Sequence, residues 1–181
     1  MSNLIQSFLE ALSSYKQEAF RLETFSSYDI ADERESFDLF QTKREVLIDD
    51  ETANYLREHE RKVKEGKRHI RARVIPEPLS DYFIYEVITG YLPQSQIGIE
   101  LCFMKEREYY DKIESQYGHL KDFWLFDQKT LVQMDYDDDG KFISPKFIDD
   151  PLVLSKALSI RNTFVTNSHP LTYLLDNYDV K

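Results

Sequence analysis

Residues 68–76 read R-H-I-R-A-R-V-I-P, and apolar and polar side chains alternate along them. A period of two is that of a β-strand, in which successive side chains point to opposite faces of a sheet. The stretch is therefore predicted to be a strand with one apolar and one basic face. The apolar face has Ile70, Ala72 and Val74, and the other face has His69, Arg71 and Arg73.

Four further strands are predicted on the C-terminal side of this one. The first is I-G-I-E-L-C-F-M at 97–104. The runs D-F-W-L-F-D at 122–127 and T-L-V-Q-M-D-Y at 130–136 are rich in aromatic and aliphatic residues, and they predict two strands joined across Gln128 and Lys129. The last is K-F-I-S at 141–144.

Residues 80–93 can be interpreted in two ways. Their aromatic and β-branched side chains favour a strand. Ser80 as a cap, apolar residues at helical spacing and Gly90 near the end favour a helix. We predict a helix here.

Helices are also predicted at both ends of the chain. One apolar stripe recurs at spacings of four and three and predicts a helix over about 3–20. Its members are Leu4, Phe8, Leu12, Tyr15 and Ala19. Near the other end, Asp150 and Pro151 form a cap and first turn, and the helix that they open is broken at His169-Pro170. A last short amphipathic segment follows.

The region between the first helix and the basic strand has a mixed pattern. Residues 21–48 predict a loop and then a short helix. Asp49 or Asp50 can cap a further helix over the charged run that follows, and Gly66 supplies its left-handed end.

These elements predict one α+β domain over residues 1–181. Its sheet is expected to be mainly antiparallel, with about four to five strands, flanked by N-terminal and C-terminal helices. A chain of 181 residues fills one core well and is too short for two ordinary domains.

Composition narrows the classes of function. A net charge of -10 disfavours nucleic acids and acidic membrane surfaces, because phosphate binding depends on Lys and Arg. No apolar run is as long as a membrane span, and the N-terminus lacks the pattern of a secretion signal. The single cysteine, Cys102, agrees with a reducing compartment and reads as an inert core thiol. We expect a cytoplasmic protein.

The stretch D-Y-D-D-D-G at 135–140 has the spacing of the first half of a calcium loop. Such a loop needs a bidentate glutamate at its last position, where this chain has Lys146. It also needs flanking helices, whereas strands are predicted on both sides. A hairpin bend with a left-handed Gly140 is therefore the favoured interpretation, and no metal is predicted.

Cofactor motifs are absent from the sequence. The four histidines lack the spacing of a zinc site, and no phosphate-binding glycine loop or serine-hydrolase elbow occurs. No cofactor is predicted, and whether the chain is an enzyme stays open.

Arginines give the best functional lead. Arg71 and Arg73 leave the same face of one strand and could grip an anionic group together, or could pair with some of the many acids. Arg161, on an otherwise apolar helical stripe, is either a buried ion pair or part of a site. Trp124 reads first as a core anchor.

Taken together, several segments resemble a family of small uncharacterised bacterial proteins, a domain of unknown function often encoded near helix-turn-helix regulators. They are A-F-R-L-E at 19–23, Tyr28, E-G-K-R-H-I-R-A-R-V-I-P-E-P at 65–78, D-F-W-L-F-D at 122–127, D-Y-D-D-D-G at 135–140, F-I-D-D-P at 147–151 and Arg161. Many members carry a tryptophan-bearing segment where this chain has residues 37–50. The resemblance implies a shared fold and shared polar positions. These are Arg21, Glu23, Arg71, Arg73, Asp122, Asp127 and Arg161.

The sequence leaves two functions open. The first is a regulatory module that acts with a protein partner, such as a transcriptional regulator. The alternative is an enzyme or sensor that binds an anionic small molecule, a nucleotide or phosphorylated metabolite. The predicted ligand-binding residues are Arg21, Glu23, Arg71, Arg73, Trp124, Asp127 and Arg161. Nucleic acid is an unlikely partner unless the strand arginines and nearby lysines form one basic face.

Overall fold

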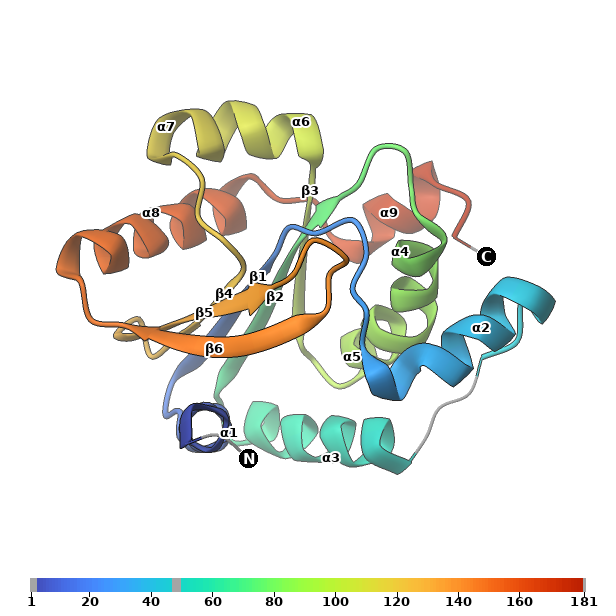
Figure 1. The fold of residues 1–181 in the computed structure, drawn as a ribbon, viewed down its shortest axis with the longest axis horizontal. Coiled ribbons are helices and arrows are strands. Elements are labelled where there is room, and N and C mark those ends of the chain that lie inside the picture. Colours follow the sequence, from blue (N-terminus) through green and yellow to red (C-terminus); the bar gives the residue numbers. More distant parts are fainter. Residues whose placement is uncertain (1–2, 47–49, 181) are drawn as a thin grey trace.

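A computed structural model describes residues 3–46 and 50–180 and contains one six-stranded mixed sheet (Figure 1). Its strand order is β3-β2-β1-β4-β5-β6. The strands are β1 Glu18–Glu23, β2 Arg68–Ile75, β3 Glu100–Lys105, β4 Phe123–Phe126, β5 Thr130–Tyr136 and β6 Phe142–Ile148. The first three run parallel to one another, and β1, β4, β5 and β6 pair antiparallel in that order.

The α+β class is confirmed, but the prediction of a mainly antiparallel sheet with four to five strands was wrong. The missing strand is β1, which lies at the centre of the sheet. Sequence analysis placed its start in the first helix and its end in a loop, because Leu12, Tyr15 and Ala19 keep a helical spacing. The helix α1 instead spans Asn3–Ser14. The alternation within E-A-F-R-L-E is too short to outweigh the stripe that precedes it.

Helical crossovers explain the parallel half of the sheet. Between β1 and β2 the chain forms η1 Ala31–Glu33, α2 Arg34–Lys43 and α3 Asp50–Lys64. Between β2 and β3 it forms α4 Asp81–Glu86, the π-helical η2 Val87–Tyr91 and α5 Leu92–Gln96. Parallel neighbours require such long connections, whereas antiparallel ones need only a turn.

The predicted helices in these crossovers are confirmed. Ser80 caps α4 by accepting a hydrogen bond from the amide of Phe83 at 3.0 Å. Gly66, with a φ of +83°, follows α3 in the left-handed conformation. The alternative cap at Asp49 lies outside the described residues.

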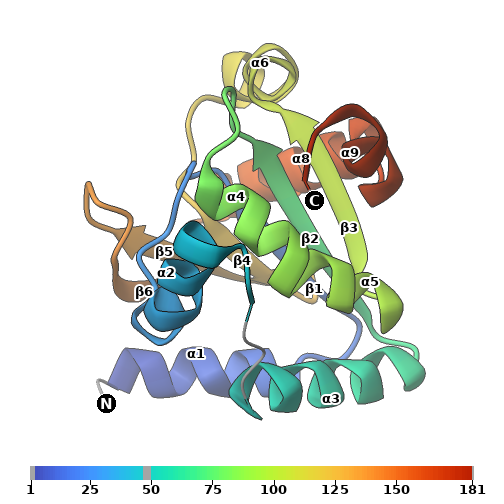
Figure 2. The ribbon, with the colours of Figure 1, turned by 90° about the vertical axis from the view of Figure 1, so that its right-hand side faces the viewer.

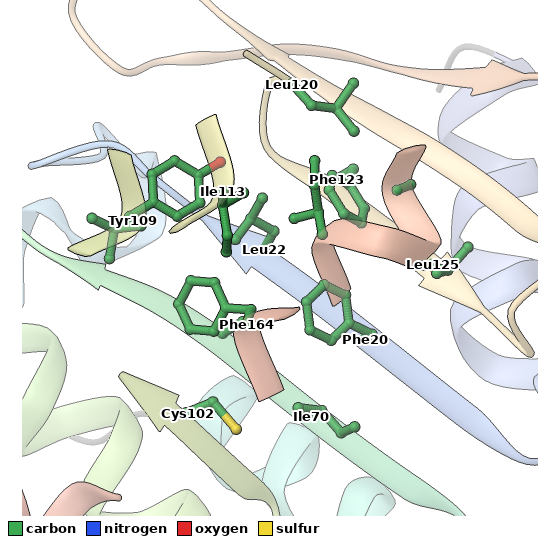
Figure 3. Packing of buried hydrophobic residues seen from close by; sticks show 14 of the residues in the cluster. Phe20, Leu22, Ile70, Cys102, Tyr109, Ile113, Leu120, Phe123, Leu125 and Phe164 are labelled. Carbon is green, nitrogen blue, oxygen red and sulfur yellow. The ribbon is translucent and has the colours of Figure 1, made fainter. Parts of the chain in front are cut away.

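One face of the sheet carries the largest apolar core (Figure 3). It is covered by α8 Pro151–Asn167 and by the segment α6 Glu106–Tyr109, η3 Tyr110–Glu114 and α7 Ser115–Tyr117. Phe20, Leu22, Ile70 and Phe123 point into this core from the strands, and Phe164 meets them from α8. The predicted cap of α8 is confirmed, since the carboxylate of Asp150 accepts from the amides of Leu152 and Val153.

The opposite face is covered by α1, α2, α3 and the α4–α5 segment (Figure 2). The last helix, α9 Leu171–Asn177, packs beside the edge strand β3. Since alternate residues of one strand point to opposite faces, β1 and β2 present mainly aromatic and aliphatic residues to α8, with Glu18 as a charged exception, and most of their charged residues to α1–α5.

Both predicted hairpins are confirmed. A turn that includes Gln128 joins β4 to β5, and the acidic stretch from 135 to 140 joins β5 to β6. In the second bend the side chain of Asp137 accepts from the amides of Asp139 and Lys141 at 3.1 and 2.9 Å. Gly140 has a φ of +81°, and an added Cβ would lie 2.6 Å from the carbonyl oxygen of Ser27. Only glycine fits this position.

Candidate functional site

A cavity of about 430 Å³ lies between the charged face of the sheet and the helices that cover it. Its walls combine aromatic rings with charged groups, the composition typical of a small-molecule site. The rings belong to Phe8, Tyr28, Tyr55, Tyr82, Tyr85, Trp124 and Tyr136. The charged lining residues are Arg21, Glu23, Asp32, Glu33, Arg71 and Glu86.

Arg71 lies on the floor of the cavity and is held by the neighbouring strand. Its Nη2 and Nε atoms donate to the two carboxylate oxygens of Glu23 at 2.5 and 3.1 Å. Its Nη1 donates to the side chain of Gln94 at 3.2 Å. The parallel pairing of β1 and β2 places Glu23 and Arg71 within reach. All three nitrogens of the guanidinium are thus engaged by the protein.

Arg73 is fully buried and is not among the cavity's lining residues. Its Nε donates to Glu86 on α4 at 3.1 Å, and its Nη1 donates to the carbonyl oxygen of Phe25. Tyr91 donates to the other oxygen of Glu86 at 3.1 Å. This second pair joins the sheet to the helix above it.

Arg21 is the most loosely held of the three guanidiniums. Its Nη2 donates to the hydroxyl of Tyr136 at 2.7 Å, while Asp122 and Glu23 lie 3.6 Å away. Its guanidinium lies 5.6 Å from the ring centre of Trp124, a cation–π distance. Its buried Nη1 has no hydrogen-bond partner within the part of the chain that the structure describes.

Asp122 anchors the loop that follows β1. The amide and hydroxyl of Thr24 donate to one carboxylate oxygen at 2.9 and 2.6 Å, and the hydroxyl of Tyr28 donates to the other at 2.5 Å. Because Asp122 is fully buried, these bonds and Arg21 provide its compensation. The contact holds Tyr28 in the cavity wall.

Charge is balanced in this polar network. Arg21, Arg71 and Arg73 face the carboxylates of Glu23, Glu86 and Asp122. Burial favours a raised pKa for Glu23, but the guanidiniums of Arg71 and Arg21 outweigh it and lower that pKa to about 2. Glu86 differs, because burial raises its pKa and Arg73 offsets only part of the effect.

Glu33 is a fourth carboxyl and lies on the cavity wall, at the end of η1. Burial raises its pKa to about 7. The hydroxyl of Tyr82 donates to it at 2.7 Å, yet no lysine, arginine or histidine of the described segments forms an ion pair with it. Perturbed carboxyls in clefts are candidate functional groups.

The structure brings together four of the seven predicted site residues. Arg21, Glu23, Arg71 and Trp124 line the cavity, and Arg73 lies beside it. The other two lie elsewhere. Asp127 occupies the β4–β5 turn and accepts from the amides of Lys16, Gln17 and Glu18, which fixes the start of β1.

Arg161 lies on the opposite face of the sheet. Its Nε donates to Glu18 at 2.9 Å, and its Nη2 donates to the second oxygen of the same carboxylate. The sequence left a buried pair and a site open for Arg161, and the structure places it in the pair.

Sequence reasoning missed the groups that α4 and η1 supply to the cavity. Tyr82, Tyr85 and Glu86 are spaced by three and four, so they share one face of a helix. That spacing in D-Y-F-I-Y-E was a usable signal. Glu33 had none, because it stands in the charged run A-D-E-R-E, which is typical of a solvated helix.

No group of three or more histidine, cysteine, aspartate or glutamate side chains in residues 3–46 and 50–180 could hold a metal ion. Over the same segments, no helix is both long and apolar enough to cross a membrane.

Comparison with known proteins gives a family but no activity. No curated protein matches the chain. The model of one protein family, described as a domain of unknown function (DUF6879), matches residues 6–175. That span contains the six strands and the cavity. The chain therefore belongs to the family DUF6879, a domain of unknown function.

Proposed function

We propose that this domain binds a small organic molecule with a flat ring in the cavity between the sheet and α1–α5. The observation that supports it is the lining, in which five tyrosines, Trp124 and Phe8 surround a space of about 430 Å³. Flat rings stack on such side chains, and the few polar groups among them can set the orientation.

A nucleotide or phosphorylated metabolite, the ligand expected from the arginines, has less support. Phosphate recognition uses guanidinium N–H groups that are free to donate. The guanidinium of Arg71 already donates to Glu23 and Gln94, and the guanidinium of Arg73 is buried and donates to Glu86. Among the described residues of the network, Nη1 of Arg21 and Nη2 of Arg73 have no hydrogen-bond partner, and of these two arginines Arg21 lines the cavity. A ring with a single acceptor suits Nη1 of Arg21 better than a phosphate does.

A regulatory protein partner stays a prediction. Large exposed apolar side chains are spread over several elements, with Leu4 and Leu9 on α1, Ile143 on β6 and Leu152 on α8. Isolated apolar residues of this kind are common on protein surfaces. Binding in the cavity is compatible with such a partner, since a ligand between the sheet and α1–α5 could change the surface of these helices that a partner contacts.

Trp124 makes the proposal directly testable, because it is the single tryptophan of the chain and lines the cavity. Indole-free aromatic fragments, namely benzamide, phenol and adenine, would be titrated while the tryptophan emission and the saturation transfer to each fragment are recorded. We expect at least one fragment to show both signals.

Gly90 offers a matched pair of control variants. It lines the cavity, and beyond the neighbouring backbone of its own helix the nearest described atom to an added Cβ is Nε2 of Gln94, at 3.7 Å. Gly90→Phe should fill the cavity and abolish both signals, whereas Gly90→Ala should keep them. Signals that persist in a folded Gly90→Phe variant, or no signal from any fragment at millimolar concentration, would overturn the proposal.

A further inference from the structure

We infer that the ring bound in the cavity carries a positively charged group, an amine, amidine or guanidine, and that Glu33 is the residue that recognises it. The inference rests on the proposed function, since it names the charge of the molecule that the same cavity takes. It follows from the charges, the contacts of Glu33 and the aromatic rings beside it.

The first argument is charge balance. Three guanidiniums and three carboxylates neutralise one another in the polar network that borders the cavity. Glu33 is additional to this set, and Asp32 beside it also lines the cavity. The nearby cation on that segment, Arg34, is already held by both oxygens of Asp29, at 2.8 and 2.5 Å. The cavity lining thus contains two carboxyl groups, those of Asp32 and Glu33, that the guanidiniums of the network do not neutralise.

Glu33 has fewer protein partners than its two carboxyl oxygens can accept. Tyr82 on α4 donates to Oε2, which leaves Oε1 without a protein donor among the described residues. A half-buried carboxyl normally has a cation or several donors. A ligand cation against Oε1 would supply the missing partner, in the charge-assisted geometry that carboxylates form with amidines and guanidines.

The third argument is the aromatic surroundings. The rings of Tyr82 and Tyr85 lie 6.0 Å apart, and the ring of Tyr28 lies 6.1 Å from that of Tyr82. Organic cations bind to clusters of aromatic faces because the ring quadrupole is negative above the plane. Here such a cluster adjoins an unpaired carboxyl, and both line one cavity.

The groups that act on Glu33 come from three elements. On α4 the hydroxyl of Tyr82 favours its ionised form and the charge of Glu86 opposes it. On the sheet, Arg71 of β2 favours ionisation and Glu23 of β1 opposes it. Burial is the largest effect and keeps the proton on. A bound cation should therefore favour loss of the proton, so binding of the cation should strengthen as the pH rises.

Three probes of one shape separate charge from shape. Benzamidine is a cation, benzamide is its neutral counterpart and benzoate is an anion. Their dissociation constants would be measured by Trp124 emission and by saturation transfer, at pH 5.5 and pH 8.5. We expect benzamidine to bind at least tenfold more tightly than benzamide at pH 8.5, with a smaller ratio at pH 5.5 and the weakest binding for benzoate.

Two matched substitutions test the role of Glu33. Glu33→Gln should bring the benzamidine to benzamide ratio at pH 8.5 close to one, through weaker binding of benzamidine. Glu35→Gln makes the same chemical change two residues away, on an exposed part of α2 that does not line the cavity, and should keep the full ratio.

The outcomes separate the two proposals. Suppose that benzamide or benzoate binds, that Gly90→Phe abolishes this binding, and that benzamidine binds no more tightly than they do. The cavity then takes rings, but the inference on charge is overturned. A benzamidine preference that survives Glu33→Gln overturns the role of Glu33. If none of the three probes binds in the cavity, the inference on charge fails, and the proposed function fails as well only if phenol and adenine also do not bind.

Discussion

The two faces of the sheet are made by the same strands and yet are held together by different forces. Facing α8, Phe20, Leu22 and Ile70 belong to one apolar cluster with Phe164, and the ion pair of Arg161 with Glu18 lies on the same face. Facing α4, their neighbours Arg21 and Arg71 lie in a network of ion pairs around a cavity. Apolar burial stabilises the fold, whereas buried ion pairs contribute little beyond the cost of removing charge from water. The first face is therefore expected to contribute most of the stability, whereas the second carries the cavity in which we propose that a ring binds.

The largest effect on stability is expected from the apolar face. Phe164→Ala removes a fully buried ring that packs against Tyr109 at 6.1 Å between ring centres. Buried Phe→Ala substitutions cost about 3 to 5 kcal/mol, and we expect about 4 kcal/mol here. Chemical denaturation followed by circular dichroism measures it. A loss below about 1 kcal/mol would mean that α8 contributes little to the core.

On the polar face, breaking one pair should cost somewhat less. Arg73→Met leaves the carboxylate of Glu86 buried without its main cation, and we expect a loss of about 3 kcal/mol. Adding Glu86→Leu removes the stranded charge and should restore about 1 to 2 kcal/mol. If the double variant is as unstable as the sum of the two single variants, the pair is not coupled and the comparison of the faces breaks down.

Glu33 should make the polar face less stable at high pH. Because its pKa is raised to about 7 in the folded chain, its contribution is fully present below the ordinary glutamate pKa. That contribution is lost as the pH rises through about 7, when the unfolded chain has already released the proton. Glu33→Gln should therefore match the parent chain at pH 4 and exceed its stability at pH 8 by about 1 to 3 kcal/mol.

Denaturant midpoints at both pH values test this prediction, with Glu35→Gln as the control that should show no pH-dependent gain. A Glu33→Gln variant that is no more stable than the parent chain at pH 8 would show that the carboxyl of Glu33 is solvated and keeps the usual pKa of a glutamate.

The smallest effect is expected at Gly90, on the cavity side of η2. Its backbone is helical and an added methyl group has room, so Gly90→Ala should raise stability by about 0.4 to 1 kcal/mol by restricting the unfolded chain. Thermal melting of the two chains measures it. A destabilised variant would mean that the cavity wall is already closely packed at this point, as the apolar face is.

The sequence predicted those elements whose patterns are local. The alternation in β2, the two hairpins and the capped helix α8 each depend on neighbouring residues, and all were found. The central strand β1 was missed because it follows the stripe of α1 after only three residues. The parallel order of β1, β2 and β3 depends on which strands the crossovers join, and propensity alone does not encode this order.

The candidate site follows the same division. Arg71 came from the strand pattern, and Arg21 and Glu23 came from the family resemblance. The spacing of Tyr82, Tyr85 and Glu86 indicated a shared helical face on α4, but tertiary packing decides whether that face meets the sheet, and Glu33 on η1 had no signal. The same applies to Asp127, whose carboxylate could bind a ligand or hold a segment of backbone. The three backbone amides at the start of β1 that donate to it are identified only in the folded structure.

The contact between Asp122 and Thr24 can form only late in synthesis of the chain. The two residues lie 98 positions apart, and their contact holds the loop from which Tyr28 enters the cavity wall. An N-terminal fragment that ends before β4 lacks this anchor, Trp124 and one of the two neighbours of β1. A chain emerging from the ribosome therefore acquires the last lining residue, Tyr136, only after about three quarters of its 181 residues have been synthesised, so binding of a ring would report that β1, β4 and β5 have assembled.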